Sequence, residues 1–311
     1  MPTQMQTRPI TERVNPASRS LERKSLREIL QIINREDQKV ARAVAKVIPE
    51  IAKAAEIVIP ALAAGGRLVY IGAGTSGRLG ALDAAECLPT FGTTQVTAVL
   101  AGGPRAMLTP AEGAEDDTRL AVLDLKKIHL RRRDVLMAIS ASGRTPYACE
   151  GLRYARRIGA KTIALTSNPG SPLCGLADVA IVPVTGPEVV AGSTRMKSGT
   201  AQKLVLNMLS TACMVRLGKV YSGLMVGVQL TNHKLRERAE GILMQAAGAS
   251  RAEAQKALAD SDGKLPVALV MISKRVSADT AERMLRRGTN LAALLRERGP
   301  ETRKRFGASK V

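Results

Sequence analysis

The chain has 311 residues and a net charge of +20; 45% of its residues are hydrophobic and 2% are aromatic. This hydrophobic share excludes a wholly disordered protein, and because Trp is absent the core must be built mainly from aliphatic side chains. No apolar run reaches the length of a membrane span, and the N-terminal residues lack the apolar stretch of a secretory signal. We therefore expect a cytoplasmic protein without a membrane partner.

The positive charge favours anionic partners, whether nucleic acid, phosphorylated metabolites or acidic lipids. Proteins that bind single-stranded nucleic acid stack bases on aromatic side chains, and those are scarce here. A generally basic surface explains the charge without any nucleic acid. Nucleic acid is therefore not the expected partner, whereas a phosphorylated small molecule fits the charge.

Metal ligands and histidines are few. The cysteines lie far apart without a CxxC pair, and the two histidines are His129 and His233. Structural zinc needs about four clustered nitrogen or sulfur ligands, so we expect no metal site. If the protein performs acid–base chemistry, this shortage of histidine leaves carboxylates as the agents.

The first part of the chain, residues 17–64, has apolar residues at helical spacing and is predicted to be helical up to Gly65 and Gly66. Short apolar segments then alternate with helical ones. The predicted strands are 67–71, 95–101, 134–140, 161–166 and 179–184, and the predicted helices are 76–88, 111–127, 146–158 and 199–217. This alternation predicts an α/β fold: a three-layer α/β/α sandwich with a five-stranded parallel sheet, preceded by N-terminal helices.

After residue 230 the strand patterns stop, and short helices are predicted at 231–246, 250–260, 263–274 and 277–297. These helices indicate a small separate helical unit. We expect four parts in all: an N-terminal helical arm at 1–56, the α/β domain at 57–230, the C-terminal helical unit at 231–298 and a basic tail at 299–311.

The first loop of interest is GAGTSGRLG, residues 72–80, which follows a strand and opens a helix. Its glycines allow backbone amides to approach a ligand, and a helix N-terminus favours anions. The G-x-G-x-x-G spacing is weak evidence alone, and no acidic residue ends the second strand, so a dinucleotide is not favoured. Thr75 and Ser76 place two hydroxyls at the helix start, where simple N-capping is the alternative explanation.

The second loop, SASGRTPY at 140–147, also lies between a strand and a helix. Ser140, Ser142 and Thr145 offer three hydroxyls, and Gly143 leaves a backbone amide accessible. A cap before a first-turn proline is the alternative. Because ligands of such sheets sit outside the carboxyl ends of the strands, two hydroxyl-rich loops after strands of one sheet predict a phosphate-binding site.

The residues alone do not identify a catalytic carboxylate. Two spaced pairs are available, one on the helix after the first loop and one on the next predicted helix, where members three residues apart share a face. The candidates are Asp83, Glu86, Glu112, Glu115, Asp116, Asp117, Glu150 and Glu188. Any single helical Glu is more commonly a solvated surface charge.

Several longer sequence motifs resemble those of known protein families. The two loops resemble the sugar isomerase (SIS) domain, a phosphosugar-binding α/β fold. GAGTSGRLGALDAAEC, EGAEDD, SASGRTPYACEGLRYAR and GSTRMKSGTAQKLVLNMLST are similar to the N-acetylmuramic acid 6-phosphate etherase family. TERVNPASRSLERKSLREIL resembles that family's opening, and GASRAEAQKALADSDGKLPVALVM resembles its C-terminal piece, which is similar to ubiquitin-associated units. The resemblance covers about residues 11–298, and the motifs are long. It departs where the stretch from Cys87 to Glu112 is shorter and where Leu88 replaces a proline.

The resemblance implies a lyase of amino-sugar catabolism and peptidoglycan recycling. Such an enzyme removes D-lactate from C3 of N-acetylmuramic acid 6-phosphate and leaves N-acetylglucosamine 6-phosphate, without a metal or cofactor. By the same resemblance Glu86 is the general acid and Glu115 the base at C2. The implied substrate contacts are Thr75, Ser76 and Arg78 for the sugar, Ser140, Ser142, Gly143 and Thr145 for the phosphate, and Glu188, Ser193, Arg195 and Lys197 in a later loop, with Arg195 or Lys197 facing the lactyl carboxylate.

The resemblance also implies a homodimer with each site near the subunit contact, where residues 199–233, including His233, are candidates to reach the neighbouring site. Two alternatives stay open. An aldose–ketose isomerase on the same fold would share the phosphate loops but would need no acid aimed at an ether. A sugar-phosphate-sensing regulator would usually carry an N-terminal helix-turn-helix, and no such pair of helices is recognisable here.

Overall fold

The computed structural model describes residues 8–228, 230, 233–286 and 291–296. The chain forms two compact units, one made of Met1–Glu86 and Thr94–Cys213 and the other of Cys87–Thr93 and Met214–Val311. The four-part division expected from the sequence stays a prediction, and its basic tail at 299–311 lies outside the described residues. In the described part of the chain, no helix is long and apolar enough to cross a membrane.

The first two helices of the chain are α1 (Leu26–Ala45) and α2 (Ile48–Ala63), and α2 runs past residue 56, where the N-terminal arm was predicted to end. A capping box starts α1, in which the Ser25 hydroxyl accepts from the Glu28 amide and the Glu28 carboxylate accepts from the Ser25 amide. The continuous helical stretch predicted from residue 17 is therefore interrupted. Short 3-10 turns precede α1, and a new helix starts before Pro49, because proline is tolerated in a first turn and not in a helix interior.

The sheet has five parallel strands in the order β2-β1-β3-β4-β5, which confirms the predicted fold class. Their bounds are β1 Leu68–Gly72, β2 Val96–Leu100, β3 Val135–Ile139, β4 Lys161–Leu165 and β5 Val179–Ile181. Every residue of β1 and β3 is buried. Such nearly continuous apolar strands are typical of parallel sheets that are covered on both faces.

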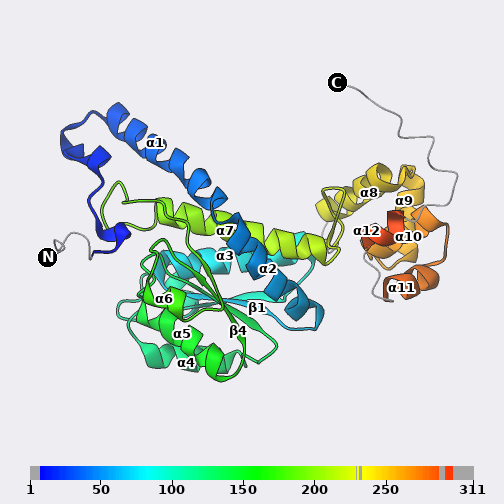
Figure 1. Cartoon of the computed structure of the whole chain (residues 1–311). Coiled ribbons are helices and arrows are strands. Elements are labelled where there is room, and N and C mark those ends of the chain that lie inside the picture. Colours follow the sequence, from blue (N-terminus) through cyan, green and yellow to red (C-terminus); the bar gives the residue numbers. More distant parts are fainter. Residues whose placement is uncertain (1–7, 229, 231–232, 287–290, 297–311) are drawn as a thin grey trace. The chain divides into compact units, whose positions relative to one another are not determined.

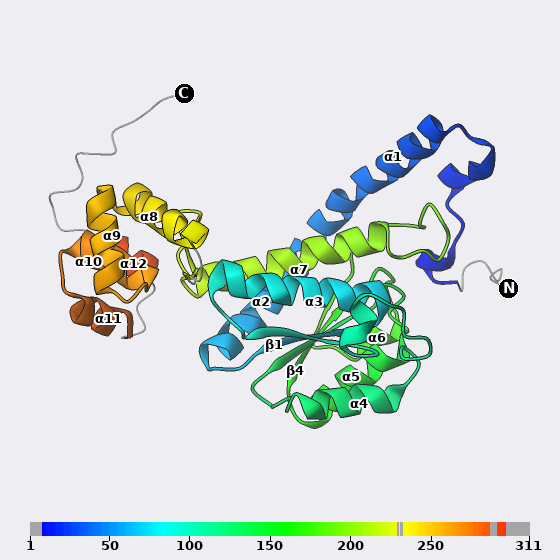
Figure 2. The same cartoon turned by 180° about the vertical axis from the view of Figure 1, so that it is seen from behind.

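Helices cover both faces of this sheet (Figures 1 and 2). One face carries α2, α3 (Gly74–Phe91) and α7 (Lys197–Arg216), and the other carries α4 (Thr118–Lys127), α5 (Pro146–Arg157) and α6 (Pro172–Gly175). On the second face Leu125 and Leu152 pack with strand residues such as Ile71 and Leu136 in one buried cluster. This core holds the carboxyl ends of the strands, and the loops after them, in a fixed arrangement.

The structure corrects the prediction of a helix over 111–127. The helix α4 begins at Thr118, where the Asp117 side chain accepts from the amides of Arg119 and Leu120. The preceding residues form turns, and Gly113 has a φ of +72° that a helix does not allow. Glu112 and Glu115 therefore do not share a helix face.

The second unit begins with a small hairpin, β6 (Val220–Tyr221) and β7 (Leu224–Met225), which the sequence analysis did not predict. Its helices are α8 (His233–Ala247), α9 (Arg251–Asp260), α10 (Leu265–Lys274), α11 (Ala278–Arg286) and α12 (Leu291–Arg296). They share a core around Leu243, Leu258 and Leu269. The single helix predicted at 277–297 is described as α11 and α12, and residues 287–290 and 297 lie outside the described part.

Candidate functional site

The second loop gathers its hydroxyl groups at the end of β3. Ser140 Oγ lies 2.8 Å from Thr145 Oγ1 and 3.3 Å from Ser142 Oγ, and it accepts a hydrogen bond of 3.1 Å from the Gly143 amide. Three hydroxyls and one backbone amide therefore converge on one point, as the sequence predicted for a phosphate site. Each hydroxyl can also donate a hydrogen bond to an anion. The Gly143 amide already donates to Ser140, at 3.0 Å to its carbonyl oxygen and at 3.1 Å to its Oγ.

Gly143 is required for this loop conformation. Its φ is +66°, and a Cβ at this position would lie 2.1 Å from Ser171 Oγ and 2.7 Å from Thr166 Oγ1. Any side chain would therefore be strained and would collide with the loop after β4. The glycine therefore allows the second loop to pack closely against the loop after β4.

Most of the first loop, residues 74–80, is part of the helix α3. Because α3 begins at Gly74, Thr75 and Ser76 lie in its first turn and not in a preceding loop. Ser76 is buried, and the methyl group of Thr75 would lie 3.5 Å from a Cβ built on Gly199 of α7. The amide groups of this first turn face the carboxyl edge of the sheet, where a helix N-terminus favours negative charge.

Arg78 connects α3 to the loop after β2. Its Nε donates to the carbonyl oxygens of Ala106 and Met107, at 2.9 and 3.0 Å. Its side chain also lines a pocket of about 240 Å³ together with Gly74, Glu112 and Glu115. Arg78 therefore fixes the position of the loop that carries both glutamates.

Glu115 lies between the two loops. Its carbonyl oxygen accepts a 3.0 Å hydrogen bond from the amide of Tyr147, in the first turn of the helix that the second loop opens. Its side chain lines the same pocket as Gly74 and Arg78 of the first loop and helix. The backbone of Glu115 is thus tied to the helix that the second loop opens, and the residue lines the pocket at the start of α3.

Glu86 is placed elsewhere on the same chain. It is exposed near the end of α3 and does not line the pocket that contains Glu115. At 1.5 Å per residue it lies about 18 Å along the helix from Gly74. One turn earlier, the buried Asp83 carboxylate accepts hydrogen bonds from Tyr70, Asn207 and Ser210, at 2.6–3.2 Å. The chain therefore separates Glu86 from Glu115 and uses Asp83 to join α3 to α7.

The loop before α7 contains the other candidates. Glu188 is fully buried, and its two carboxylate oxygens accept from the amides of Lys197 and Ser198, each at 2.9 Å. It therefore caps the helix and compensates its positive end. Ser193 is half-buried and Arg195 is exposed.

Lys197 forms a buried ion pair with Glu36 of α1. Its Nζ lies 2.6 Å from Glu36 Oε2, which also accepts 2.9 Å from Asn15 Nδ2, and Lys39 pairs with the other oxygen. Burial by itself raises the pKa of Glu36, but the hydrogen bonds from Lys197, Lys39 and Asn15 outweigh it and lower the pKa to about 2. The ammonium group of Lys197 is thus already bonded within the chain.

The N-terminal strap, which we define as residues 8–15, joins three loops at the same edge of the sheet. The Ile10 amide donates 2.6 Å to Asn168 Oδ1 in the loop after β4, and the Thr11 carbonyl accepts 2.9 Å from Gly192 before α7. Asn168 Nδ2 donates to Thr11 Oγ1 and, at 2.9 Å, to the carbonyl of Ala141 in the second loop. The strap therefore buttresses the predicted phosphate loop.

Sequence reasoning missed the strap and Glu36 as parts of the site. One signal was available: Glu36 stands between Ile32 and Val40 at four-residue spacing, where an apolar side chain would continue the buried stripe of α1. A charged residue at such a position indicates a buried partner. That partner, Lys197, lies 161 residues later and cannot be located by local patterns.

Four further polar residues at this edge are buried and hold side-chain atoms without a hydrogen-bond partner among the described residues. They are Ser167 after β4, Thr185 after β5, and Ser198 and Gln202 in the first turns of α7. Buried polar groups are rarely left unpaired. These unpartnered polar atoms lie where the strands end. In the described part of the chain, this edge of the sheet therefore contains buried hydrogen-bonding groups that are free to bind a ligand.

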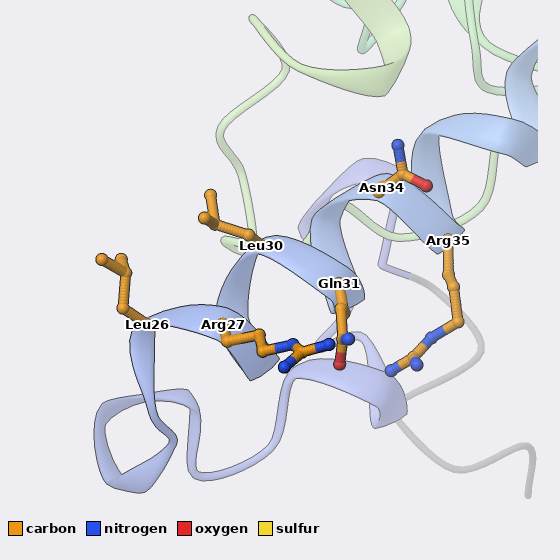
Figure 3. A pocket seen from close by; sticks show the side chains of 6 residues that line it. All are labelled: Leu26, Arg27, Leu30, Gln31, Asn34 and Arg35. Atoms are coloured by element: carbon orange, nitrogen blue, oxygen red, sulfur yellow. The ribbon is translucent and has the colours of Figure 1, made fainter.

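A pocket of about 760 Å³ on α1 has a different character. Figure 3 shows that its labelled side chains all come from one helix, with Leu26 and Leu30 on one side and Gln31 and Arg35 on the other. It contains no hydroxyl or carboxylate group to bind a sugar. It is an exposed helix face and not a candidate active site.

Two remaining predictions concern metals and His233. Among the residues that the structure describes, no group of three His, Cys, Asp or Glu side chains is placed to hold a metal ion. His233 begins α8 in the second unit and is exposed, with Nδ1 3.7 Å from Glu237 Oε2. The expectation that residues 199–233 reach a neighbouring site stays a prediction.

Two family models and a solved structure match parts of this chain. The N-terminal SIS domain model of glucokinase regulatory protein matches residues 50–156, and the SIS domain model matches residues 121–212. A solved phosphoheptose isomerase from Francisella tularensis matches with a TM-score of 0.49 and 20% identity, over 62% of this chain and 99% of that chain.

Curated relatives match over nearly the whole chain. The N-acetylmuramic acid 6-phosphate etherase of Edwardsiella ictaluri (strain 93-146) is 53% identical over 280 residues, which are 89% of this chain and 93% of that protein. The etherase of Histophilus somni (strain 129Pt) is 50% identical over 278 residues, or 89% of this chain and 92% of that protein. At this identity and coverage, the chain belongs to the N-acetylmuramic acid 6-phosphate etherase family.

Proposed function

We propose that this protein is a carbon–oxygen lyase that cleaves the D-lactyl ether of N-acetylmuramic acid 6-phosphate, giving N-acetylglucosamine 6-phosphate and D-lactate. Family membership supports the activity. The structural observation that carries the proposal is the position of Glu115, which lies beside the pocket at the start of α3 and is bonded through its carbonyl to the helix that the second loop opens.

The 6-phosphate binds to the second loop. The hydroxyls of Ser140, Ser142 and Thr145 now bond one another, and a phosphate oxygen that enters between them accepts these hydrogen bonds instead. The amide of Gly143 adds a donor when a phosphate oxygen replaces the Ser140 oxygens that this amide now bonds. The sugar then extends toward the start of α3, where its hydroxyl groups meet the half-buried Thr75 and the more deeply buried Ser76.

The chemistry follows from the acidity of a proton next to a carbonyl. When the sugar ring opens to its aldehyde, the proton on C2 becomes acidic, and Glu115 removes it as the base. The ether oxygen on C3 receives a proton and leaves with the lactate, so that a carbon–carbon double bond forms. Water then adds to the unsaturated aldehyde at C3. The reaction therefore needs one positioned base and one positioned acid.

The acid in this scheme is Glu86, supplied by a second copy of the chain. Glu86 does not line the pocket that contains Glu115 and lies about 18 Å along α3 from Gly74, so two subunits offer a way to bring both glutamates to one site. The surface around it favours such contact, because Leu82 and Leu88 of the same helix are 48% and 41% exposed. A homodimer would cover these side chains, and exposed apolar patches commonly mark protein contacts.

The buried groups before α7 act indirectly. Glu188 and Lys197 are bonded to the helix start and to Glu36, so we assign them to the positioning of α7. Arg195 and Ser193 stand in the same loop with accessible side chains. Of these candidates, Arg195 is the one we assign to the lactyl carboxylate, because its guanidinium group is exposed and can bind a carboxylate in bidentate geometry.

One assay tests the proposal and separates it from the isomerase alternative. The purified protein is incubated with N-acetylmuramic acid 6-phosphate, and D-lactate is measured with a coupled dehydrogenase. N-acetylglucosamine 6-phosphate and glucose 6-phosphate serve as parallel substrates for isomerisation. Release of D-lactate is the expected result. Isomerisation of a phosphosugar without lactate release would overturn it.

A further inference from the structure

A second pocket, of about 190 Å³, lies between the N-terminal strap and the loop after β4. Arg8 and Arg13 of the strap line it together with Arg144 of the second loop, and Asn168 and Ser171 form the other wall. None of these residues lines the pocket that contains Glu115. The two pockets are therefore separate hollows.

The lining of this second pocket is cationic. It includes three guanidinium groups and no carboxylate. Within the described parts of the chain, none of the three arginines forms an ion pair with an acidic side chain. The nearest acidic residue along the strap, Glu12, is directed toward Gly192, where its carboxylate would lie 3.2 Å from an added Cβ. Like charges held together in this way favour the binding of an anion.

The walls of the pocket are fixed by hydrogen bonds. Arg13 Nε donates 3.2 Å to the carbonyl of Arg8, which closes the turn that carries both arginines. The Ile10 amide donates 2.6 Å to Asn168, whose side chain is only 5% exposed. The opposite wall is equally constrained, because Ser171 packs against Gly143 so closely that a Cβ would not fit. The backbone that carries the arginines is thus held by hydrogen bonds, while the three arginines themselves are exposed.

We propose that this pocket is a second anion site, distinct from the hydroxyls around Ser140, and that it binds a phosphate-type oxyanion. Guanidinium groups match the geometry of such an anion with paired hydrogen bonds. Two of the arginines belong to the strap and Arg144 belongs to the second loop, so a bound anion links the strap to the loop assigned to the substrate phosphate. The ligand is free phosphate or a phosphate ester that acts as an effector.

Calorimetric titration with inorganic phosphate, at constant ionic strength, tests the site in the full chain. The wild-type protein is expected to bind two phosphates per chain. Arg8→Ala and Arg13→Ala each weaken one of the two events about tenfold or more, whereas Ser142→Ala weakens the other. Arg42→Ala, an exposed arginine of α1 outside the pocket, changes neither.

The outcomes are distinct. A single binding event that responds to Ser142→Ala and ignores both strap variants overturns the proposal, as does the absence of any phosphate binding. Arg13→Ala also removes the hydrogen bond that closes the turn, so it could weaken binding by disturbing the strap. Arg8→Ala does not, because the turn uses the backbone carbonyl of Arg8 and not its side chain. A second titration with glucose 6-phosphate identifies the ligand: tighter binding than phosphate at the arginine site indicates an ester, and weaker binding indicates the free ion. None of these results depends on lactate release.

Discussion

At the scale of single residues, the predicted phosphate site and the predicted base occupy compatible positions. The hydroxyls that the sequence placed in one loop do converge, and Ser140 is the centre of their hydrogen bonds. Glu115 could not be separated from Glu112 by pattern alone, and both line the same pocket. The distinction between them rests on the bond from Tyr147 to the Glu115 backbone and on the family motif.

The first prediction concerns Ser142. Among the residues that the structure describes, its hydroxyl bonds Ser140 and the amide of Arg144, and Ser142 is half-buried, so Ser142→Ala should leave the fold intact. A hydrogen bond from a neutral donor to a charged acceptor contributes about 1.5–3 kcal/mol. The KM for the phosphosugar should therefore rise about tenfold or more. Steady-state kinetics measures it, with Ser277→Ala as a control on the second unit. An unchanged KM would remove Ser142 from the phosphate site.

The second prediction separates the two glutamates. Glu115→Gln and Glu86→Gln should each lower kcat by about 10²–10⁴-fold, the usual contribution of a positioned acid or base. In heavy water, Glu86→Gln keeps its base and should still exchange the C2 proton of the substrate while the lactate stays attached. Glu115→Gln should lose this exchange. NMR of the substrate follows both.

The control for this pair is Glu112→Gln, because Glu112 lines the same pocket as Glu115 without a role in the scheme. It should retain most of the wild-type kcat. Exchange that survives in Glu115→Gln and disappears in Glu86→Gln would reverse the two assignments. Near-native turnover in both variants would move the chemistry to other residues.

At the scale of elements, local patterns located the strands and most helices because each is short, apolar and bounded by turn residues. The same patterns failed where one residue redirects the chain. Gly113 and the cap Asp117 exclude a helix before Thr118, although the charge spacing fits one. The hairpin of β6 and β7 was missed because two-residue strands have no periodicity, and only the positive φ of Ser222 and Gly223 marks the turn.

Contacts between elements were beyond the reach of the sequence. The strap, α1 and α7 are joined through Asn15, Glu36 and Lys197, which lie far apart along the chain. In the sequence, each of these three residues is an isolated polar residue. No local pattern indicates that they contact one another. The C-terminal helices α8, α9 and α10 were predictable because each is short and bounded by its own turn, whereas α11 and α12 were predicted as one helix.

The third prediction follows from the buried pair of Glu36 and Lys197. The pKa of Glu36 is about 2 in the fold against an ordinary 4.5, because hydrogen bonds outweigh the effect of burial. A lowered pKa stabilises the fold at pH values above 4.5, and this contribution is lost as the pH falls from 4.5 to 2. It amounts to about 3 kcal/mol. Denaturant unfolding between pH 7 and pH 3 should show more than half of this loss in the wild type, because pH 3 still lies above the pKa of Glu36 in the fold.

Glu36→Gln should flatten that part of the pH dependence, and it should lower stability at pH 7 by about 3–5 kcal/mol, since it leaves the Lys197 charge buried without its partner. Glu56→Gln is the matched control, because Glu56 is an exposed carboxylate on α2. Its pH dependence should follow the wild type. The same slope in Glu36→Gln and in the wild type would show that the buried pair does not govern acid stability.

At the scale of the whole molecule, two features favour a dimer: the separation of Glu86 from Glu115, and the exposed apolar residues. Leu82 and Leu88 accompany Glu86 on α3, and Leu26 and Leu30 form an apolar stripe on α1 (Figure 3). A chain that worked alone would leave these side chains in water and its acid away from its base. Two copies related by a two-fold axis would cover the apolar residues and complete two identical sites.

The last prediction tests this arrangement by mixing two inactive variants. In Glu86→Gln every chain keeps Glu115, and in Glu115→Gln every chain keeps Glu86. If each site takes its base from one chain and its acid from the other, a mixed dimer has one complete site and one site that lacks both groups. With free exchange of subunits, half of the dimers are mixed, so lactate release should recover to about a quarter of the wild-type rate.

Light scattering confirms the dimer, and mixing each variant with itself sets the baseline. If acid and base act within one chain, no mixed dimer contains a complete site, and the activity stays at that baseline. This result would overturn the shared site. It would not bear on the individual roles of Glu86 and Glu115, which the C2 exchange experiment tests.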